Sequence, residues 1–302
     1  MSATQRDVKA RIGSVKNIQK ITRAMEMVAA ARLRRAEQRI AALRPYAGAI
    51  RRMTRQAAEA AGSSEIARLP ILAEHDSEEK VALLLVTGDR GLAGAFNTQI
   101  VRAGIRAANE ADGEVQWFAS GRRGVSSLTF RGYDVAGQWQ GFTDRPSFEN
   151  ARDIAGDIAS QYIDGKVDRV EMTYNGYVSP LTQDVTTDVL LPLAAVEQLL
   201  EEDDEGSESE ERDSGHKTLW IYEPDPEEIL KRLVPDYIEI SIYRALLEST
   251  ASEHGARMTA MRSAQENAGE MIDDLTLEMN RQRQAEITQE IMEVVAGAEG
   301  LS

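Results

Sequence analysis

Apolar residues recur every three or four positions along the first 60 residues of the chain. The recurring positions are Val8, Ile12, Val15, Ile18, Ile21, Met25, Val28, Ile40 and Leu43. This spacing places them on one side of an α-helix, and helix-forming residues fill the gaps between Gly13 and Gly48. The pattern predicts one helix from about residue 4 to about residue 60, roughly 80 Å long. We expect Pro45 to bend this helix or to mark a break in it.

The last part of the chain predicts a second long helix. After Pro235 the sequence contains no further proline, and its only interior glycines before Gly297 are Gly255 and Gly269. It therefore predicts a helix of about 60 residues, roughly 90 Å long. Alanine recurs at every fourth position of this segment, at Ala256, Ala260, Ala264 and Ala268. Because small residues let two helices approach closely, we expect the two long helices to lie alongside each other.

Between the two helical segments, residues 78–222 alternate between apolar runs and helical patterns, as in an α/β domain. Strands are predicted near residues 80–87, 115–119, 133–139, 167–175, 183–190 and 217–222. Helices are predicted near residues 93–110, 121–130 and 147–164. The crossovers suit a largely parallel, twisted sheet. The expected division is an N-terminal helix at 1–60, a central domain at 78–225 and a C-terminal helix at 226–302.

An acidic run interrupts the central domain at residues 201–215. It reads EEDDEGSESEERDSG and holds nine acids and one base. This composition predicts a solvated, disordered loop.

Charge is distributed unevenly along the chain. Residues 1–55 hold 14 Lys and Arg against 3 Asp and Glu, whereas the whole chain has a net charge of −15. The N-terminal helix is therefore basic and the remainder acidic, a pattern that favours an acidic protein, nucleic acid or an acidic membrane face as the partner of the helix. The absence of cysteine excludes disulfides and thiolate chemistry. No apolar run is long enough to span a bilayer, and the first residues do not resemble a secretory signal.

The stretch VTGDRGLAGAFN, at residues 86–97, is the segment most typical of a binding site. An apolar strand leads into Gly88, Gly91 and Gly94 and then into a predicted helix, as in turns that hold phosphate. The spacing differs from both common phosphate-binding motifs, so a turn whose glycines serve backbone geometry is the alternative interpretation. The three histidines show no metal-binding spacing, and no nucleophile elbow occurs. The sequence thus predicts no catalytic residue, cofactor or metal.

Both ends of the chain resemble a known family. The segments RIGSVKNIQKITRAMEMVAAARLRRA (11–36), ASEHGARMTAMRSAQENAGEMIDDL (251–275) and RQAEITQEIMEVVAGA (283–298) closely resemble the gamma subunit of bacterial F-type ATP synthases. The resemblance implies a long antiparallel coiled coil of the N- and C-terminal helices plus a central Rossmann-like α/β domain. It also implies a central rotor shaft that couples ion flow through the membrane ring to ATP synthesis or hydrolysis by rotation, without a catalytic site of its own.

The same resemblance implies partners and contact residues. The partners are the alpha, beta and epsilon subunits and the membrane c-ring, and the location is the cytoplasmic face of the bacterial plasma membrane, as a peripheral protein. The residues expected to contact beta subunits are Arg23, Met25, Arg32, Arg34, Arg35, Arg257, Gln284, Thr288 and Glu293. In the family, the glycine-rich stretch is a strand-to-helix turn and is not known as a nucleotide site.

Two other functions compete with this one. A basic coiled-coil protein could bind nucleic acid through residues 6–55, although the arginines here interleave with the apolar stripe rather than form a separate basic block. A nucleotide-dependent enzyme could use the turn at 86–97. Salt-dependent DNA binding supports the first alternative, and nucleotide binding by the isolated chain supports the second.

Overall fold

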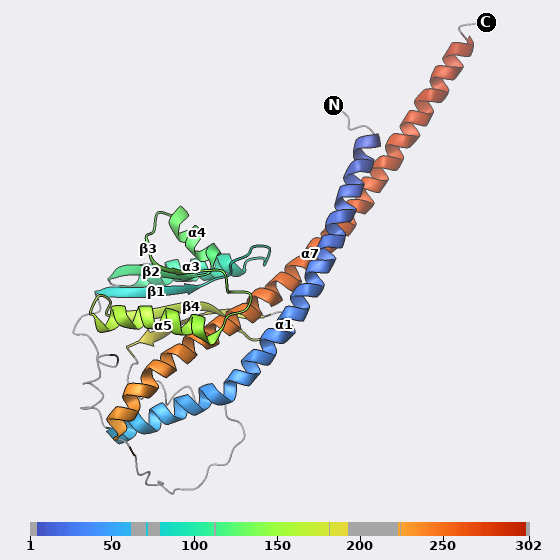
Figure 1. Ribbon diagram of the computed structural model, residues 1–302. Coiled ribbons are helices and arrows are strands. Elements are labelled where there is room, and N and C mark those ends of the chain that lie inside the picture. Colours follow the sequence, from blue (N-terminus) through green and yellow to red (C-terminus); the bar gives the residue numbers. More distant parts are fainter. Residues whose placement is uncertain are drawn as a thin grey trace. The chain divides into compact units, whose positions relative to one another are not determined.

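The computed structural model describes residues 5–61, 71, 79–111, 113–180, 182–192, 223 and 225–299. Two long helices, α1 (Gln5–Ala61) and α7 (Pro226–Glu299), precede and follow a five-stranded α/β region in the sequence (Figure 1). The predicted fold class is confirmed. The strand expected at 217–222 and the acidic run at 201–215 lie outside the described residues.

The chain divides into two compact units. One consists of Met1–Ala31 and Arg257–Ser302, and we call it the coiled-coil unit. The other consists of Arg32–Ala256, and we call it the α/β unit. Each long helix contributes to both units, whereas the three-part division expected from the sequence assigns each helix to a single part.

The α/β unit contains one sheet of five strands. They are β1 (Lys80–Val86), β2 (Glu114–Ser120), β3 (Val135–Trp139), β4 (Arg169–Tyr177) and β5 (Gln183–Leu191). Their order is β3-β2-β1-β4-β5, and only the β4–β5 pairing is antiparallel. The central strand β1 is apolar and buried over nearly its whole length, as expected for a parallel strand covered on both faces. The prediction of a largely parallel sheet is therefore correct.

Helices cover both faces of this sheet. They are α3 (Phe96–Glu110), α4 (Arg122–Phe130), α5 (Phe148–Ile163) and the first part of α7. Leu83 and Leu85 of β1 belong to the apolar cluster of α3 and α4, whereas Leu84 belongs to the cluster of α5 and α7. Alternate residues of a strand point to opposite faces, so β1 separates two cores.

On α1, the residues that face inward follow a seven-residue repeat. Buried or half-buried positions occur at alternating steps of four and three, at Val8, Ile12, Val15, Gln19, Thr22, Glu26, Ala29, Leu33, Ala36 and Ile40. This repeat is the pattern of a left-handed coiled coil. The helix continues through Pro45, so the proline does not break it.

The apolar stripe predicted for α1 is correct at Val8, Ile12, Val15 and Ile40 but wrong at Ile18, Ile21 and Val28. Ile18, Ile21 and Val28 are 50%, 59% and 52% exposed. The predicted stripe takes two successive steps of three residues after Val15, and each such step falls about 60° short of a full turn. The apolar line therefore leaves the seam, which continues instead through small and polar residues such as Thr22.

Within the coiled-coil unit, α1 and α7 are antiparallel. Gln19 Nε2 donates to the carbonyl oxygen of Gln265 at 3.5 Å, and Arg262 Nε lies 3.0 Å from Glu26 Oε1. Residues later in α1 therefore lie beside residues earlier in α7. Figure 1 shows the N-terminal part of α1 beside α7, whose last turns extend beyond it. Ala264 is half-buried and Ala268 buried, as the alanine repeat predicts.

Helix α7 begins earlier than the helix that was expected after Pro235. It starts at Pro226, and Pro235 lies inside it. Proline is well suited to the first helical position, and the backbone N–H groups of Glu228 and Ile229 both bond to the carbonyl oxygen of Asp225. Leu230, Leu233, Val234 and Ile238 are buried in the core of the α/β unit. This burial offsets the hydrogen bond that Pro235 cannot make.

Among the described residues, no helix combines the length and the apolar character needed to cross a membrane.

Candidate functional site

The glycine-rich stretch forms a tight turn held by its own side chains. The N–H of Gly88 donates to Asn97 Oδ1 at 2.8 Å. The carboxylate of Asp89 accepts bonds from the backbone N–H groups of Arg122, Gly141 and Thr143. The left-handed backbone positions are Leu92, with φ 63°, and Gly94, with φ 57°. The turn therefore joins strand β1 to α3 and to the loop before α5, which supports the interpretation based on backbone geometry.

The space at the carboxyl ends of the central strands is covered by α7. Ser249 Oγ donates to the carbonyl oxygen of Val86 at 3.3 Å, at the end of β1. Ser252 Oγ donates to the carbonyl oxygen of Asn175 at 3.2 Å, near the end of β4. Both serines are buried. Ligands of open α/β sheets usually bind in this place, so α7 stands where a nucleotide would.

Beside the turn, Asp144 links three elements of the α/β unit. Its Oδ2 lies 2.7 Å from Nη1 of Arg32 on α1 and 3.1 Å from Nη1 of Arg90 in the turn. Partial burial alone would raise the pKa of Asp144. The hydrogen bond from Arg32 and the charges of Arg32, Arg90 and His254 outweigh that effect and lower the pKa below its usual value of 3.8.

A second polar contact attaches α1 to the β4–β5 hairpin. Tyr177 Oη donates to Glu37 Oε1 at 2.5 Å. Desolvation raises the pKa of the Tyr177 phenol, and the hydrogen bond and charge of Glu37 raise it further. Arg32 and Glu37 thus hold one stretch of α1 at two points of the α/β unit.

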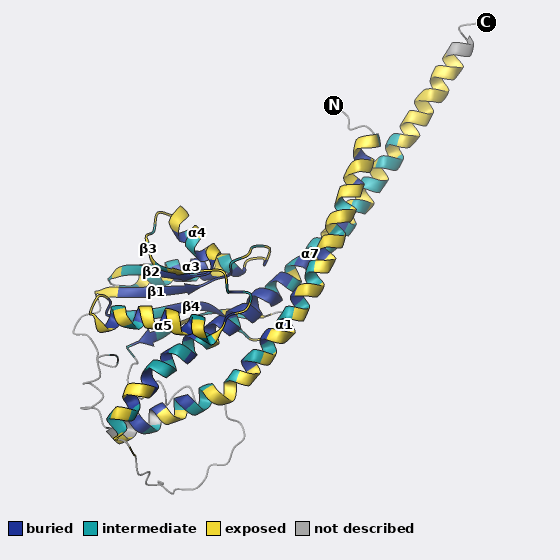
Figure 2. Cartoon of the chain, viewed as in Figure 1, coloured by how far each residue is buried: buried dark blue, intermediate teal, exposed yellow. Residues whose placement is uncertain are grey.

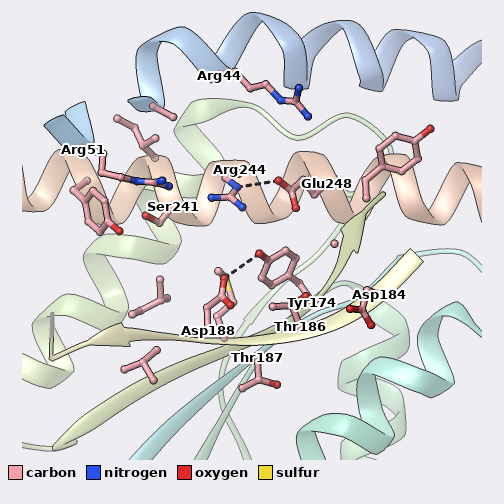
Figure 3. A pocket seen from close by; sticks show the side chains of 18 of the residues that line it. Arg44, Arg51, Tyr174, Asp184, Thr186, Thr187, Asp188, Ser241, Arg244 and Glu248 are labelled. Atoms are coloured by element: carbon pink, nitrogen blue, oxygen red, sulfur yellow. Dashed lines mark hydrogen bonds and ion pairs between the residues drawn. The ribbon is translucent and has the colours of Figure 1, made fainter. Parts of the chain in front are cut away.

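A cavity of about 900 Å³ lies between α1, α7 and the β4–β5 hairpin (Figure 3). Two pairs of polar side chains in its lining are bonded to each other. Arg244 Nε lies 2.9 Å from Glu248 Oε1, and Tyr174 Oη donates to Asp188 Oδ2 at 2.9 Å. Burial and the charges of Asp188 and Glu248 raise the pKa of Tyr174. In the described part of the chain, no group of three or more His, Cys, Asp or Glu side chains could hold a metal ion.

The predicted contact residues of α1 differ in their surroundings. Arg23, Arg34 and Arg35 are exposed, and Met25 is half-buried. Arg32 is half-buried and bound to Asp144. The structure therefore leaves three of these side chains open to a partner and engages one within the chain.

On α7, Arg257 is only 8% exposed, so most of its surface is used inside the protein. Gln284, Thr288 and Glu293 lie near the end of the helix and are exposed. Thr288 Oγ1 donates to the carbonyl oxygen of Gln284 at 2.8 Å, and Gln289 Nε2 donates to Glu293 Oε1 at 2.9 Å. The buried Arg257 and the three exposed residues thus occupy two different environments.

Residues 283–296 of α7, which we call the tip segment, are all exposed (Figure 2). Five large apolar side chains stand open to solvent there: Ile287, Ile291, Met292, Val294 and Val295. At 100° per residue, they share one side of the helix with Gln284 and Thr288, whereas Glu293 lies on the opposite side. Sequence reasoning missed this apolar side, although its spacing of three and four residues is a readable signal.

An antiparallel coiled coil joined to a five-stranded α/β unit is the class of protein that these elements define. A family model described as ATP synthase matches residues 4–301. The ATP synthase gamma chain of Rubrobacter xylanophilus is 41% identical over 300 residues, which cover 99% of each chain. That of Streptomyces avermitilis is 41% identical over 309 residues, covering 100% of this chain and 97% of the relative. The chain belongs to the ATP synthase gamma-chain family.

Solved structures show the same fold. A chain from the central stalk and c-ring of Tetrahymena thermophila mitochondrial ATP synthase matches with a TM-score of 0.59 and 26% identity, covering 81% of this chain and 99% of that one. A chain of the Euglena gracilis mitochondrial ATP synthase matches with a TM-score of 0.65 and 18% identity, covering 98% and 94%. Neither the sequence relatives nor these structures support the nucleic-acid alternative.

Proposed function

We propose that this chain is the central rotor shaft of the F1 sector of an ATP synthase. In this role it couples ion flow through the membrane ring to ATP synthesis or hydrolysis in the ring of alpha and beta subunits. The observation that carries the proposal is the antiparallel coiled coil of α1 and α7, in a chain that belongs to the gamma-chain family. Two helices that share a continuous seam resist bending and twisting better than one, as torque transmission requires.

The tip segment is the part of the shaft best suited to insertion into the alpha and beta ring. Five exposed large apolar side chains on one side of a helix are typical of a surface that a partner covers. Gln284 and Thr288 lie on that side, and we propose that they contact beta subunits. Glu293 lies on the opposite side of the helix. In a ring that surrounds the tip segment, a different subunit would contact Glu293.

The basic surface of α1 suits a partner with acidic loops. Arg23, Arg34 and Arg35 are exposed and free to approach such loops, and Met25 is half-buried near the seam. Arg32 and Arg257 take part chiefly through their positions inside the fold. A rotating shaft changes the conformation of a catalytic subunit only if the sides of the shaft differ. A conformational equilibrium shifts only when a contact binds one conformation more tightly than the other. The apolar side of the tip segment and the basic surface of α1 supply that difference.

The remaining partners follow from the same assembly. The epsilon subunit and the membrane c-ring would bind the chain, and the complex would hold it peripherally at the cytoplasmic face of the bacterial plasma membrane. The chemistry of ATP would take place in the other subunits, so the chain itself would need neither a catalytic site nor a cofactor.

Native purification tests this function. The chain would carry an affinity tag, membranes would be solubilised gently, and mass spectrometry would identify the proteins that accompany it. Recovery with alpha, beta, delta and epsilon subunits and the membrane ring is expected. Recovery of the chain alone, or with nucleic acid that is released steeply as salt increases, would contradict the proposal and favour the basic-helix alternative.

A further inference from the structure

The sheet of the α/β unit has a topological switch point at β1. The chain passes from β1 to β2 and β3 on one side, and β4 and β5 then lie on the other side. In open α/β sheets, the crevice at the carboxyl ends of the strands at such a point is where ligands bind. In this chain the crevice adjoins the glycine-rich turn, which has the composition of an anion-binding turn.

Helix α7 fills this crevice through a run of polar side chains. Ser249 and Ser252 bond to carbonyl oxygens near the ends of β1 and β4, as described above. Between them, Thr250 Oγ1 lies 2.9 Å from the carbonyl oxygen of Thr143, in the loop bound by Asp89, and 2.7 Å from the carbonyl oxygen of Leu246 in its own helix. All three hydroxyl residues are buried. Contacts from one helix surface to three separate backbone carbonyl groups fix the position and register of α7 against the sheet.

The next residue, Glu253, places its carboxyl group against the glycine-rich turn. The side chain is only 1% exposed. A Cβ atom at Gly88 would lie 2.8 Å from Oε2 and 2.9 Å from Oε1 of Glu253, closer than real Cβ contacts. Gly88 has an ordinary φ, so its lack of a side chain serves this close approach rather than the backbone angle. The turn therefore accommodates a carboxyl group beside a glycine, while the N–H of Gly88 itself is bonded to Asn97 Oδ1.

We propose that the carboxyl group of Glu253 fills the glycine-rich turn and that the crevice at the carboxyl ends of the strands is a socket for α7. In this arrangement Glu253 is a positioning residue, because it holds α7 at the sheet without contacting ATP. The consequence for torque depends on the proposed rotor function, since a socket that fixes α7 lets the α/β unit and the helix turn together. The same contact leaves no room for a nucleotide at Gly88.

Chemical rescue tests the role of the carboxyl group. Glu253→Ala in the full chain should lower the midpoint of thermal unfolding by roughly 3–10 °C, measured by far-ultraviolet circular dichroism. Sodium formate should restore at least half of this loss in a saturable way, and sodium chloride at equal ionic strength should not. Glu266→Ala, at an exposed position of the same helix, is the matched control and should respond to neither.

If Glu253→Ala yields only insoluble protein, refolding yield in formate or chloride provides the same comparison. Glu253→Gln keeps the volume of the side chain and replaces the carboxyl group by an amide, so it should also lower the midpoint. A Gln variant as stable as the parent chain, or an Ala variant insensitive to formate, would overturn the proposal.

A double-mutant cycle tests the geometry separately. Gly88→Ala should destabilise the parent chain, because the new methyl group meets the Glu253 carboxyl group. In the Glu253→Ala background the same change should cost little, so the two effects should be clearly non-additive. Additive effects would show that the two residues do not meet. These measurements use the isolated chain, so a negative result would contradict the socket but not the rotor function. A negative result in the native purification would contradict the rotor function but not the socket.

Discussion

Arg32 of α1 places its Nη1 atom 2.7 Å from Oδ2 of Asp144, in the loop that precedes α5. This contact ties the second half of α1 to the same loop that receives Thr250 of α7. Both long helices are therefore attached to one loop of the α/β unit, next to the glycine-rich turn. For a rotor, such attachments determine how firmly the helices are held where they join the sheet.

Asp144→Asn should weaken this attachment in a pH-dependent manner. The pKa of Asp144 is lower in the folded chain than in the unfolded one. Its stabilising contribution is thus complete above about pH 4 and is lost as the pH falls through the folded pKa. Because the pair is partly exposed, we expect a cost of about 0.5–1 kcal/mol at neutral pH, reduced by salt. Urea unfolding of both chains between neutral and acidic pH measures it, and a difference that persists unchanged in acid would contradict the assignment.

Tyr177→Phe should loosen α1 from the β4–β5 hairpin by about 1 kcal/mol, because Glu37 loses its hydrogen-bond donor. The raised pKa of Tyr177 gives a contribution that is present below about pH 10 and lost as the pH rises above the unfolded value. Ultraviolet titration should show that the variant lacks one late-ionising phenol. Identical alkaline titration curves for variant and parent would refute this account of the contact.

Ala268→Leu should destabilise the coiled coil by about 1–3 kcal/mol, because the buried seam has no room for a larger side chain. Ala24→Leu, at an exposed position of α1, is the matched control and should change stability by less than about 0.5 kcal/mol. Circular dichroism melts of both variants make the comparison. Equal effects at the two positions would mean that the seam does not pass through Ala268.

Gln284→Ala should leave the folded chain unchanged and weaken coupling in the assembled complex by roughly two- to tenfold, in the range of a single interface residue. The ratio of ion pumping to ATP hydrolysis in membrane vesicles is the relevant measurement. Glu286→Ala, exposed on the opposite side of the same helix, controls for loss of a polar group. The same loss for both variants would indicate that the apolar side of the tip segment is not the contact surface.

The elements that could be predicted are those whose sequence has a single dominant signal. Residues 81–86 of strand β1 form a continuous apolar run that predicts a buried strand, and the helical crossovers between strands predict the largely parallel pairing. The long helices follow from tens of residues rich in helix formers, in which Pro45 and Pro235 are the prolines inside the two helices. The helical pattern read after Pro235 covers α7 except its first turns, because buried side chains on both sides of Pro235 carry the helix through it.

The seam of α1 could not be predicted from hydrophobicity alone. Ile18 and Ile21 are apolar and exposed, whereas Thr22 and Ala29 are buried. In a shaft that works inside a ring, large apolar residues also serve surfaces that partners cover, so hydrophobicity does not separate the inner seam from the outer contact. The seven-residue spacing is the better guide, because it follows from helix geometry and not from side-chain size.

The contact between α7 and the glycine-rich turn also could not be predicted from the sequence. Gly88 and Glu253 lie far apart in the chain, and each taken alone has an ordinary interpretation. Only the folded sheet brings the carboxyl group to the glycine. The glycine spacing of the turn indicated a close approach by some group but not that the group comes from α7.

The most direct test of the rotor function is to watch the chain turn. The sequence contains no cysteine, so Phe130→Cys, at a 92% exposed position of α4, gives a single attachment point for a probe. With the alpha and beta ring fixed to a surface, the account predicts that the probe rotates in one direction while ATP is hydrolysed and stops when ATP is removed. A probe that stays still while the complex hydrolyses ATP would contradict the account.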